Sequence, residues 1–170
     1  MASALIGPKG SEINRKSQRI CLGRKIGAGK LAAVSQTGLP QIEHEVTVMF
    51  YDTDCAAVIH NIAYLRFIEE ARTIMAERMG MPLRGMVETG LYPVVLRTEI
   101  DYHAPGRVGE RLLVRGGVKD LSRVRFRVEF EIVRPEDGLL LATCSQTLAL
   151  IRMPGAKAER LPEEWFKARP

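Results

Sequence analysis

The sequence predicts an α+β domain in which about five antiparallel strands accompany one long helix. A strand-like segment is followed by a single amphipathic helix, and four more strand-like segments then follow in succession, separated by short turns. Short connections between consecutive strands favour an antiparallel meander. The length of 170 residues fits one domain.

The first strand is predicted at residues 43–51, where apolar and polar side chains alternate. Val46, Val48 and Phe50 would share one face of this strand. Residues 52–60 are expected to form a loop. Asn61 is the predicted N-cap of the helix, because its side chain can accept a hydrogen bond from a free amide one turn on.

The helix is predicted at residues 62–79. Its apolar residues recur at spacings of three and four, which is typical of a helix with one face in the core. Gly80 suits the end of the helix, and Pro82 follows where a helix cannot continue. The predicted apolar stripe contains Leu65, Phe67, Ile68, Ala71, Ile74, Met75 and Met79.

After the helix, residues 81–93 are expected to form a loop with a short helical turn. Four strands are predicted at residues 94–102, 110–120, 123–134 and 139–152. Turn-forming residues separate them at 104–106, 121–122 and 135–138. Residues 153–170 are expected to pack loosely.

The positive net charge of +5 is confined to the N-terminal part of the chain. Residues 1–40 hold seven Lys or Arg and one acidic residue, and they show no helix or strand period. We therefore predict a basic, flexible extension at residues 1–40, with a targeting or partner-binding arm as the alternative, and one domain at residues 41–170. The domain holds 18 basic and 19 acidic residues, so no nucleic-acid partner is expected.

Several other classes of protein lack support in the sequence. No apolar run approaches the roughly 18 residues of a membrane span, and no leader pattern is visible, so a cytoplasmic location is expected. Cys21, Cys55 and Cys144 are widely spaced and indicate neither a zinc site nor a disulfide framework. No cluster of metal ligands is apparent.

The candidate chemistry lies just before the helix. The start of a helix offers unpaired N–H groups and partial positive charge, which can hold an oxyanion. Asp54 could act there as a base or a nucleophile, or it could simply order the loop through an Asx turn. His60 is a candidate general acid or base, or a polar residue at the mouth of the helix.

Residues 51–54 (Tyr-Asp-Thr-Asp), Tyr64 ten residues after Asp54, and the Glu69-x-x-Arg72 pair together resemble a known family. They are similar to the hotdog-fold acyl-CoA thioesterases of the 4-hydroxybenzoyl-CoA thioesterase and YbgC-like group, over residues 43–162. This resemblance implies a hotdog fold, in which an antiparallel sheet wraps around one long central helix. It also implies an acyl-CoA substrate, with coenzyme A as part of the substrate rather than a cofactor, and a homodimer or homotetramer.

The resemblance assigns roles to residues of the loop and the helix start. It implies that Asp54 attacks the thioester or activates water and that the backbone N–H of Asn61 faces the thioester carbonyl. Tyr64, one turn into the predicted helix, could contact the substrate or the carboxylate. Ala57 stands where family members commonly have glycine, which indicates a slightly different loop. His60 also departs from the family pattern.

Charged residues elsewhere carry further candidate roles. Glu69 and Arg72 are three residues apart and are predicted to face each other on the helix. Because some hotdog thioesterases use a helical glutamate as catalyst, the resemblance also makes Glu69 and Glu70 backup candidates for catalysis. Arg123 and Arg125 alternate with Arg127 and could bind the phosphates of coenzyme A. The alternative is a solvated face of the sheet, paired with nearby glutamates.

We therefore predict hydrolysis of a small or medium acyl-CoA to free acid and coenzyme A. Two alternatives stay open: a hotdog enoyl-CoA hydratase, whose chemistry also uses an Asp and a His, and a non-catalytic acyl-CoA-binding module.

Overall fold

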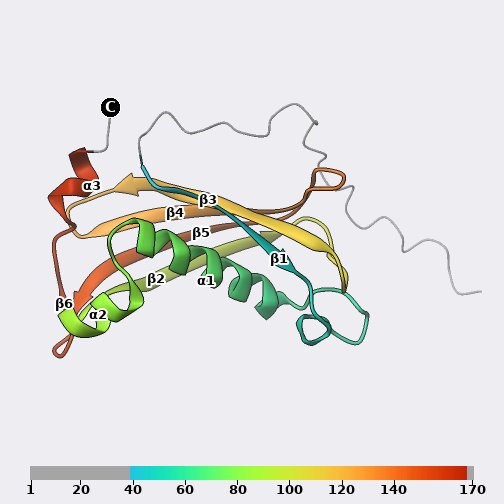
Figure 1. The fold of residues 1–170 in the computed structure, drawn as a ribbon, viewed down its shortest axis with the longest axis horizontal. Helices are drawn as coiled ribbons and strands as arrows, with labels where there is room; N and C mark the ends of the chain where they lie inside the picture. Colours follow the sequence, from blue (N-terminus) through green and yellow to red (C-terminus); the bar gives the residue numbers. More distant parts are fainter. Residues whose placement is uncertain (1–38, 168–170) are drawn as a thin grey trace, which may run out of the picture.

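The computed structural model describes residues 39–167, in which one long helix lies against a curled antiparallel sheet (Figure 1). The predicted extension at residues 1–40 lies outside the described residues, apart from Leu39 and Pro40. The sheet contains β1 (Gln41–Thr47), β2 (Leu91–Tyr102), β3 (Arg111–Leu121), β4 (Arg125–Arg134) and β5 (Leu139–Arg152) in the order β1-β3-β4-β5-β2. All pairings are antiparallel, which confirms the predicted α+β class.

Helix α1 (Asn61–Arg78) supplies one side of the hydrophobic core. Phe67, Ile68 and Ala71 are fully buried and Met75 is nearly so. Burial of each large side chain of this kind contributes about 1.5–3 kcal/mol. The predicted stripe is thereby confirmed at its centre, while Leu65 is only partly buried.

The first strand is shorter than predicted, because β1 ends at Thr47 and residues Phe50–Asp52 form the 3₁₀ turn η1. The carboxylate of Asp52 accepts a hydrogen bond from the Met49 N–H at 2.9 Å, which folds the chain back on itself. Val46 and Val48 are both buried, whereas the side chain of Phe50 is 84% exposed. The prediction that Phe50 shares one face with the two valines was therefore wrong.

The N-cap of α1 is His60, not Asn61 as predicted. The backbone of His60 is extended, and its ring Nδ1 accepts a hydrogen bond from the Ala63 N–H at 3.2 Å. Asn61 is instead the first residue of the helix. At the other end, Gly80 adopts a left-handed backbone (φ +79°), as expected for the residue that follows a helix.

The predicted helical turn after α1 is the short helix α2 (Leu83–Thr89). It ends at Gly90, whose φ is +66° and where an added Cβ would lie 2.6 Å from the carbonyl oxygen of Met153. Glycine is required here by both the backbone angle and the close approach. The strands β3, β4 and β5 begin and end within two residues of their predicted positions.

The C-terminal segment packs against the domain, which corrects the prediction that it would pack loosely. The short strand β6 (Lys157–Ala158) pairs with β5, and helix α3 (Glu163–Lys167) follows it. Trp165 lies edge-on to Phe126, with ring centroids 5.3 Å apart, and its indole N–H donates to the Met79 carbonyl at 3.4 Å. Burial of apolar surface beside the end of α1 therefore holds this segment in place, although its sequence shows no clear helix or strand period.

No helix among the described residues is long and apolar enough to cross a membrane.

Replacing Trp165 with alanine is expected to lower the free energy of unfolding by about 1–3 kcal/mol, which is less than for a fully buried tryptophan because this side chain is half-buried. Urea unfolding followed by circular dichroism measures the effect, and Lys157→Ala, at an exposed position of β6, is the control. An unchanged midpoint in the Trp165 variant would contradict the packing of α3 on the domain.

Candidate active site

Asp54 lies in a tight loop between η1 and α1. The loop is closed by a hydrogen bond from the Asp54 N–H to the Val58 carbonyl at 2.9 Å and by a β-bridge between Thr53 and Ile59. Asp54 is exposed, and its Oδ1 accepts from the Ala56 N–H at 2.8 Å. Within residues 39–167, Oδ2 has no hydrogen-bonding partner. Asp54 therefore orders the loop through an Asx turn and at the same time keeps one carboxylate oxygen open to solvent.

Ala57 completes this loop in a left-handed conformation, with φ of +58°. This conformation costs an alanine roughly 1 kcal/mol relative to glycine. Its N–H donates to the Asp54 carbonyl at 2.9 Å, which helps to hold the turn. The backbone thus takes the left-handed angle that glycine adopts freely, although a methyl group is present.

The loop is anchored to the core through Ile59. Its N–H donates to the Gly106 carbonyl at 2.9 Å, and its side chain is buried. A Cβ added at Gly106 would lie 2.4 Å from Cδ1 of Ile59, so glycine permits this close contact.

The start of α1 holds two backbone N–H groups without a partner among the described residues. The N–H of His60 donates to the Asp52 carbonyl at 3.0 Å, and the N–H of Ala63 is taken by the ring and the carbonyl of His60. Asn61 and Ile62 lie between them in the first turn, where no helical acceptor exists. Both residues are exposed, so their N–H groups can meet a ligand from solvent.

The capping contact defines what the His60 ring does in this structure. Nδ1 is occupied by the Ala63 N–H, and His60 makes no hydrogen bond to Asp54 among the described residues. The structure therefore shows a structural role for His60 at the mouth of the helix. A part for it in catalysis stays a prediction.

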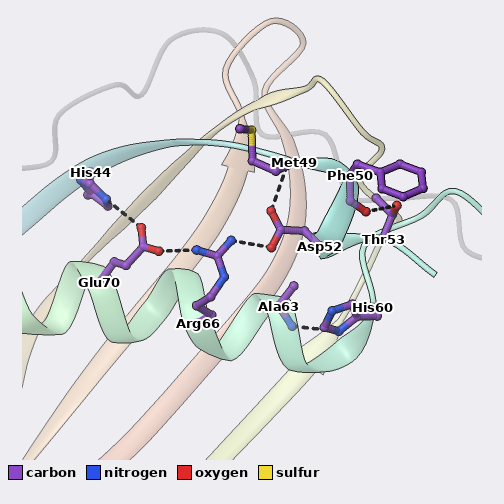
Figure 2. A network of polar contacts seen from close by, with 9 residues as sticks. All are labelled: His44, Met49, Phe50, Asp52, Thr53, His60, Ala63, Arg66 and Glu70. Carbon is purple, nitrogen blue, oxygen red and sulfur yellow. Dashed lines mark hydrogen bonds and ion pairs between the residues drawn. The ribbon is translucent and has the colours of Figure 1, made fainter.

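A chain of charged side chains connects η1 with α1 and β1, as Figure 2 shows. Asp52 is 1% exposed, and its Oδ1 pairs with Arg66 on α1 at 2.5 Å. Arg66 also pairs with Glu70, whose other oxygen lies 3.4 Å from Nε2 of His44. The sequence alone did not connect these residues.

Tyr64 is buried beneath the start of α1, with 3% of its surface exposed. Its hydroxyl donates to the Ala104 carbonyl at 3.4 Å and accepts from the Gly106 N–H at 3.3 Å. Burial raises the pKa of Tyr64. The structure thus uses Tyr64 to join α1 to residues 104–106, and its predicted contact with substrate stays a prediction.

Tyr102 at the end of β2 was not singled out in the sequence, yet it lies at the helix start. Its hydroxyl donates to the Asn61 carbonyl at 3.3 Å, and its ring meets that of Tyr64 edge-on at 5.3 Å. The Tyr102 side chain is 46% exposed, so it forms part of the accessible wall beside the free N–H groups. Burial of its hydroxyl region raises the pKa of Tyr102.

The predicted pair of Glu69 and Arg72 is confirmed, with 2.5 Å between the charged groups. Arg72 also donates to the buried Gln146 on β5 at 2.8 Å, and Gln146 in turn donates to Thr98 on β2 at 3.3 Å. Glu69 is exposed on the second turn beyond Asn61, so its place as a backup catalyst stays a prediction.

Arg123 and Arg125 lie far along the sheet from Asp54. Arg125 begins β4 and is exposed beside Phe126, which contacts Trp165 near the C-terminal end of α1. Their neighbour Arg127 pairs with Asp120 at 2.6 Å and with Glu129 at 3.5 Å, which supports a solvated face for this arginine. The structure therefore does not bring this row to Asp54 within one chain, and its contact with coenzyme A stays a prediction.

In the part of the chain that the structure describes, no three His, Cys, Asp or Glu side chains gather as ligands for a metal ion.

Comparison with known proteins assigns the chain and its fold to a family. Residues 48–169 match the thioesterase-like superfamily. The chain belongs to this superfamily.

Several similar proteins are named as hydrolases or thioesterases of coenzyme A thioesters. A 1,4-dihydroxy-2-naphthoyl-CoA hydrolase of Synechocystis sp. is 30% identical over 126 residues, which covers 74% of this chain and 91% of that relative. The acyl-CoA thioester hydrolase YbgC of Escherichia coli O157:H7 is 26% identical over 95 residues, covering 56% of this chain and 71% of the relative. The crystal structure of a 1,4-dihydroxy-2-naphthoyl-CoA thioesterase from Synechocystis superposes with a TM-score of 0.69 at 29% identity, covering 75% of this chain and 94% of that one.

These findings confirm the resemblance, the hotdog fold and the enzyme class, a thioesterase. Two features of this thioesterase were missed in the sequence. The pairing of Asp52 with Arg66 joins residues 14 positions apart, and only the direction of α1 relative to η1 brings them together. Tyr102 was hidden because a tyrosine at the end of a strand carries no signal of its own.

Replacing Tyr64 with phenylalanine is expected to change how stability depends on alkaline pH. The folded state raises the pKa of Tyr64, so its stabilising effect is complete below the pKa of the unfolded chain, about 10, and is lost as the pH rises through the higher folded value. The Tyr64→Phe variant lacks the phenol, so it does not show this loss of stability at alkaline pH. At neutral pH it is less stable than the wild type by about 1–2 kcal/mol, because the Gly106 N–H has no acceptor.

Urea unfolding at about pH 7 and at a series of values above pH 10 measures both effects. Tyr92→Phe, which removes a phenol elsewhere on β2, is the control. Burial raises the pKa of Cys144 to about 11. Cys144 is present in every variant, so its contribution to the dependence of stability on pH is the same in each. A Tyr64→Phe protein that keeps the full alkaline loss would contradict this assignment.

Proposed function

We propose that the chain hydrolyses the thioester of a small or medium acyl-CoA, with Asp54 as base or nucleophile. An exposed carboxylate with one free oxygen lies in the loop that leads directly into a helix start with two uncommitted N–H groups, and this observation carries the proposal. As a base, Asp54 takes a proton from water, and the resulting hydroxide attacks the carbonyl carbon. The C–S bond then breaks, and coenzyme A leaves as the thiolate.

As a nucleophile, Asp54 instead attacks the carbonyl carbon itself. The C–S bond breaks, coenzyme A leaves as the thiolate, and water hydrolyses the mixed anhydride to the free acid and the regenerated carboxylate. In both routes, negative charge develops on the thioester oxygen. The N–H groups of Asn61 and Ile62 and the positive end of α1 are suited to stabilise it. A thiolate is a good leaving group, so a strong general acid is not required.

Similarity to proteins named as hydrolases of 1,4-dihydroxy-2-naphthoyl-CoA and of acyl-CoA supports coenzyme A thioesters as the substrate class. No specific contact favours the hydratase alternative, since the ring of His60 caps α1 rather than pairing with Asp54. A purely binding module would not need an exposed carboxylate beside the free amides. The cytoplasmic location stays a prediction from the sequence.

The open edge of β2 supports a homodimer. β2 pairs with β5 on one side, and on its other side no strand of residues 39–167 pairs with it. Val94 and Leu96 are 40% and 49% exposed along this twelve-residue strand. A long edge strand with exposed apolar side chains tends to pair with a strand of another chain. We propose a second copy of the chain in that place, which gives a homodimer, with a homotetramer formed from two such dimers as the alternative.

Asp54→Asn is expected to lower the rate of thiol release by at least about 100-fold. Asparagine retains an oxygen that accepts from the Ala56 N–H, so the loop keeps its turn while the base and nucleophile are lost. A colorimetric thiol reagent with short, medium, long and aromatic acyl-CoAs measures turnover, and Cys55→Ser is the neighbouring control.

Unchanged turnover in the Asp54→Asn protein would move the catalyst to Glu69 or His60. Absence of turnover by the wild-type protein with every acyl-CoA would contradict the proposed substrate class.

The double variant Val94→Lys, Leu96→Lys is expected to sediment as a monomer at concentrations at which the wild type sediments as a dimer or tetramer. Two charges on the shared edge make strand pairing between copies unfavourable. Val108→Lys places a charge at another exposed valine and serves as the control. A wild-type protein that is itself monomeric, or a double variant with unchanged mass, would contradict an interface at β2.

A further inference from the structure

Asp52 is a buried carboxylate that the proposed chemistry does not use. It holds three separate parts of the structure, as Figure 2 shows in part. One carboxylate oxygen accepts from the Met49 N–H at 2.9 Å, the other pairs with Arg66 at 2.5 Å, and its main-chain carbonyl accepts from the His60 N–H at 3.0 Å. One residue therefore ties the turn η1, the second turn of α1 and the N-cap of α1 together.

We propose that Asp52 and Arg66 are positioning residues that hold the loop of Asp54 in register with the start of α1. This inference rests on the proposed function of Asp54. The residue two positions after Asp52 is the proposed base or nucleophile, and the residue after the anchored His60 offers the first free N–H. The same anchor thus sets the relative position of the two groups that must act on one carbonyl.

Arg66 is restrained in a way that suits this role. Its guanidinium lies 5.4 Å from the ring centroid of Tyr51 and 4.8 Å from that of Phe67. Its two terminal nitrogens bridge Asp52 and Glu70, and His44 on β1 contacts Glu70. A planar, forked cation can make these contacts together, whereas a lysine ammonium is a single point of charge.

The pair is expected to affect catalysis and not only folding. Without Arg66, the carboxylate of Asp52 retains one backbone donor, and a buried charge without its partner favours opening of the turn. A displacement of about 1 Å between a reacting group and its partner can cost about 100-fold in rate. Substrate binding outside the loop would be little affected, so the loss should appear mainly in kcat.

The test compares three variants of the full chain. Arg66→Met retains the length of the side chain without its charge, and Arg66→Lys retains the charge without the fork. Arg115→Met is the matched control, because Arg115 pairs with Glu131 at 2.8 Å and joins β3 to β4 rather than the loop to α1. For each variant, thiol release gives kcat and KM, and hydrogen exchange followed by mass spectrometry gives the protection of residues 49–60.

We expect kcat to fall about 10- to 100-fold in Arg66→Met, with KM changed by less than about threefold and with faster exchange confined to residues 49–60. Arg66→Lys should recover part of kcat, and Arg115→Met should retain kcat and the protection of the loop. An Arg66→Met protein with normal kcat, or with unchanged exchange in residues 49–60, would overturn the proposal. So would a loss of kcat in Arg115→Met as large as that in Arg66→Met, or an Arg66→Lys protein no better than Arg66→Met.

The exchange measurement does not depend on turnover, so the two proposals can fail separately. Full activity in Asp54→Asn would refute the proposed catalytic role of Asp54, whereas normal protection in Arg66→Met would refute the positioning role whatever the activity shows.

Discussion

The burial of one face of α1 against the curled sheet is the constraint on which the site depends. Phe67, Ile68 and Met75 can leave water together only if the helix lies along the sheet in one orientation, and that orientation fixes where its first turn emerges. Tyr64 then locks this turn to residues 104–106, and Ile59 locks the preceding loop to Gly106. The exposed groups of the site are therefore held by contacts in the core beneath them.

Those parts of the fold that repeat a local pattern could be predicted from the sequence. The spacing of Ile68, Ala71 and Met75 located α1, and turn-forming residues marked the ends of β3, β4 and β5. The errors arose where a specific contact overrides the pattern of apolar and polar residues. Residues 48–51 alternate like a strand, but the carboxylate of Asp52 captures the Met49 N–H and turns the chain. The segment after residue 152 has little periodicity, yet Trp165 finds a surface on Phe126.

The candidate site shows the same division between local and distant information. Glu69 and Arg72 are three residues apart, so their pairing follows from the geometry of the helix alone. The role of His60 could not be separated from that of Asn61, because which of the two residues is extended depends on the His60 N–H reaching the Asp52 carbonyl. The pairing of Asp52 with Arg66 depends on how two elements lie in space, which no local pattern records.

The left-handed alanine in the loop has a consequence for how sharply the loop is defined. Glycine at position 57 would adopt φ near +58° freely, but it would also make many other conformations accessible to a short exposed turn. Alanine has fewer alternatives to lose, so part of the energetic cost of its unusual angle is offset by a smaller loss of entropy on folding. The methyl group thus restricts the loop around Asp54 to fewer backbone conformations, at the cost of a strained angle at residue 57.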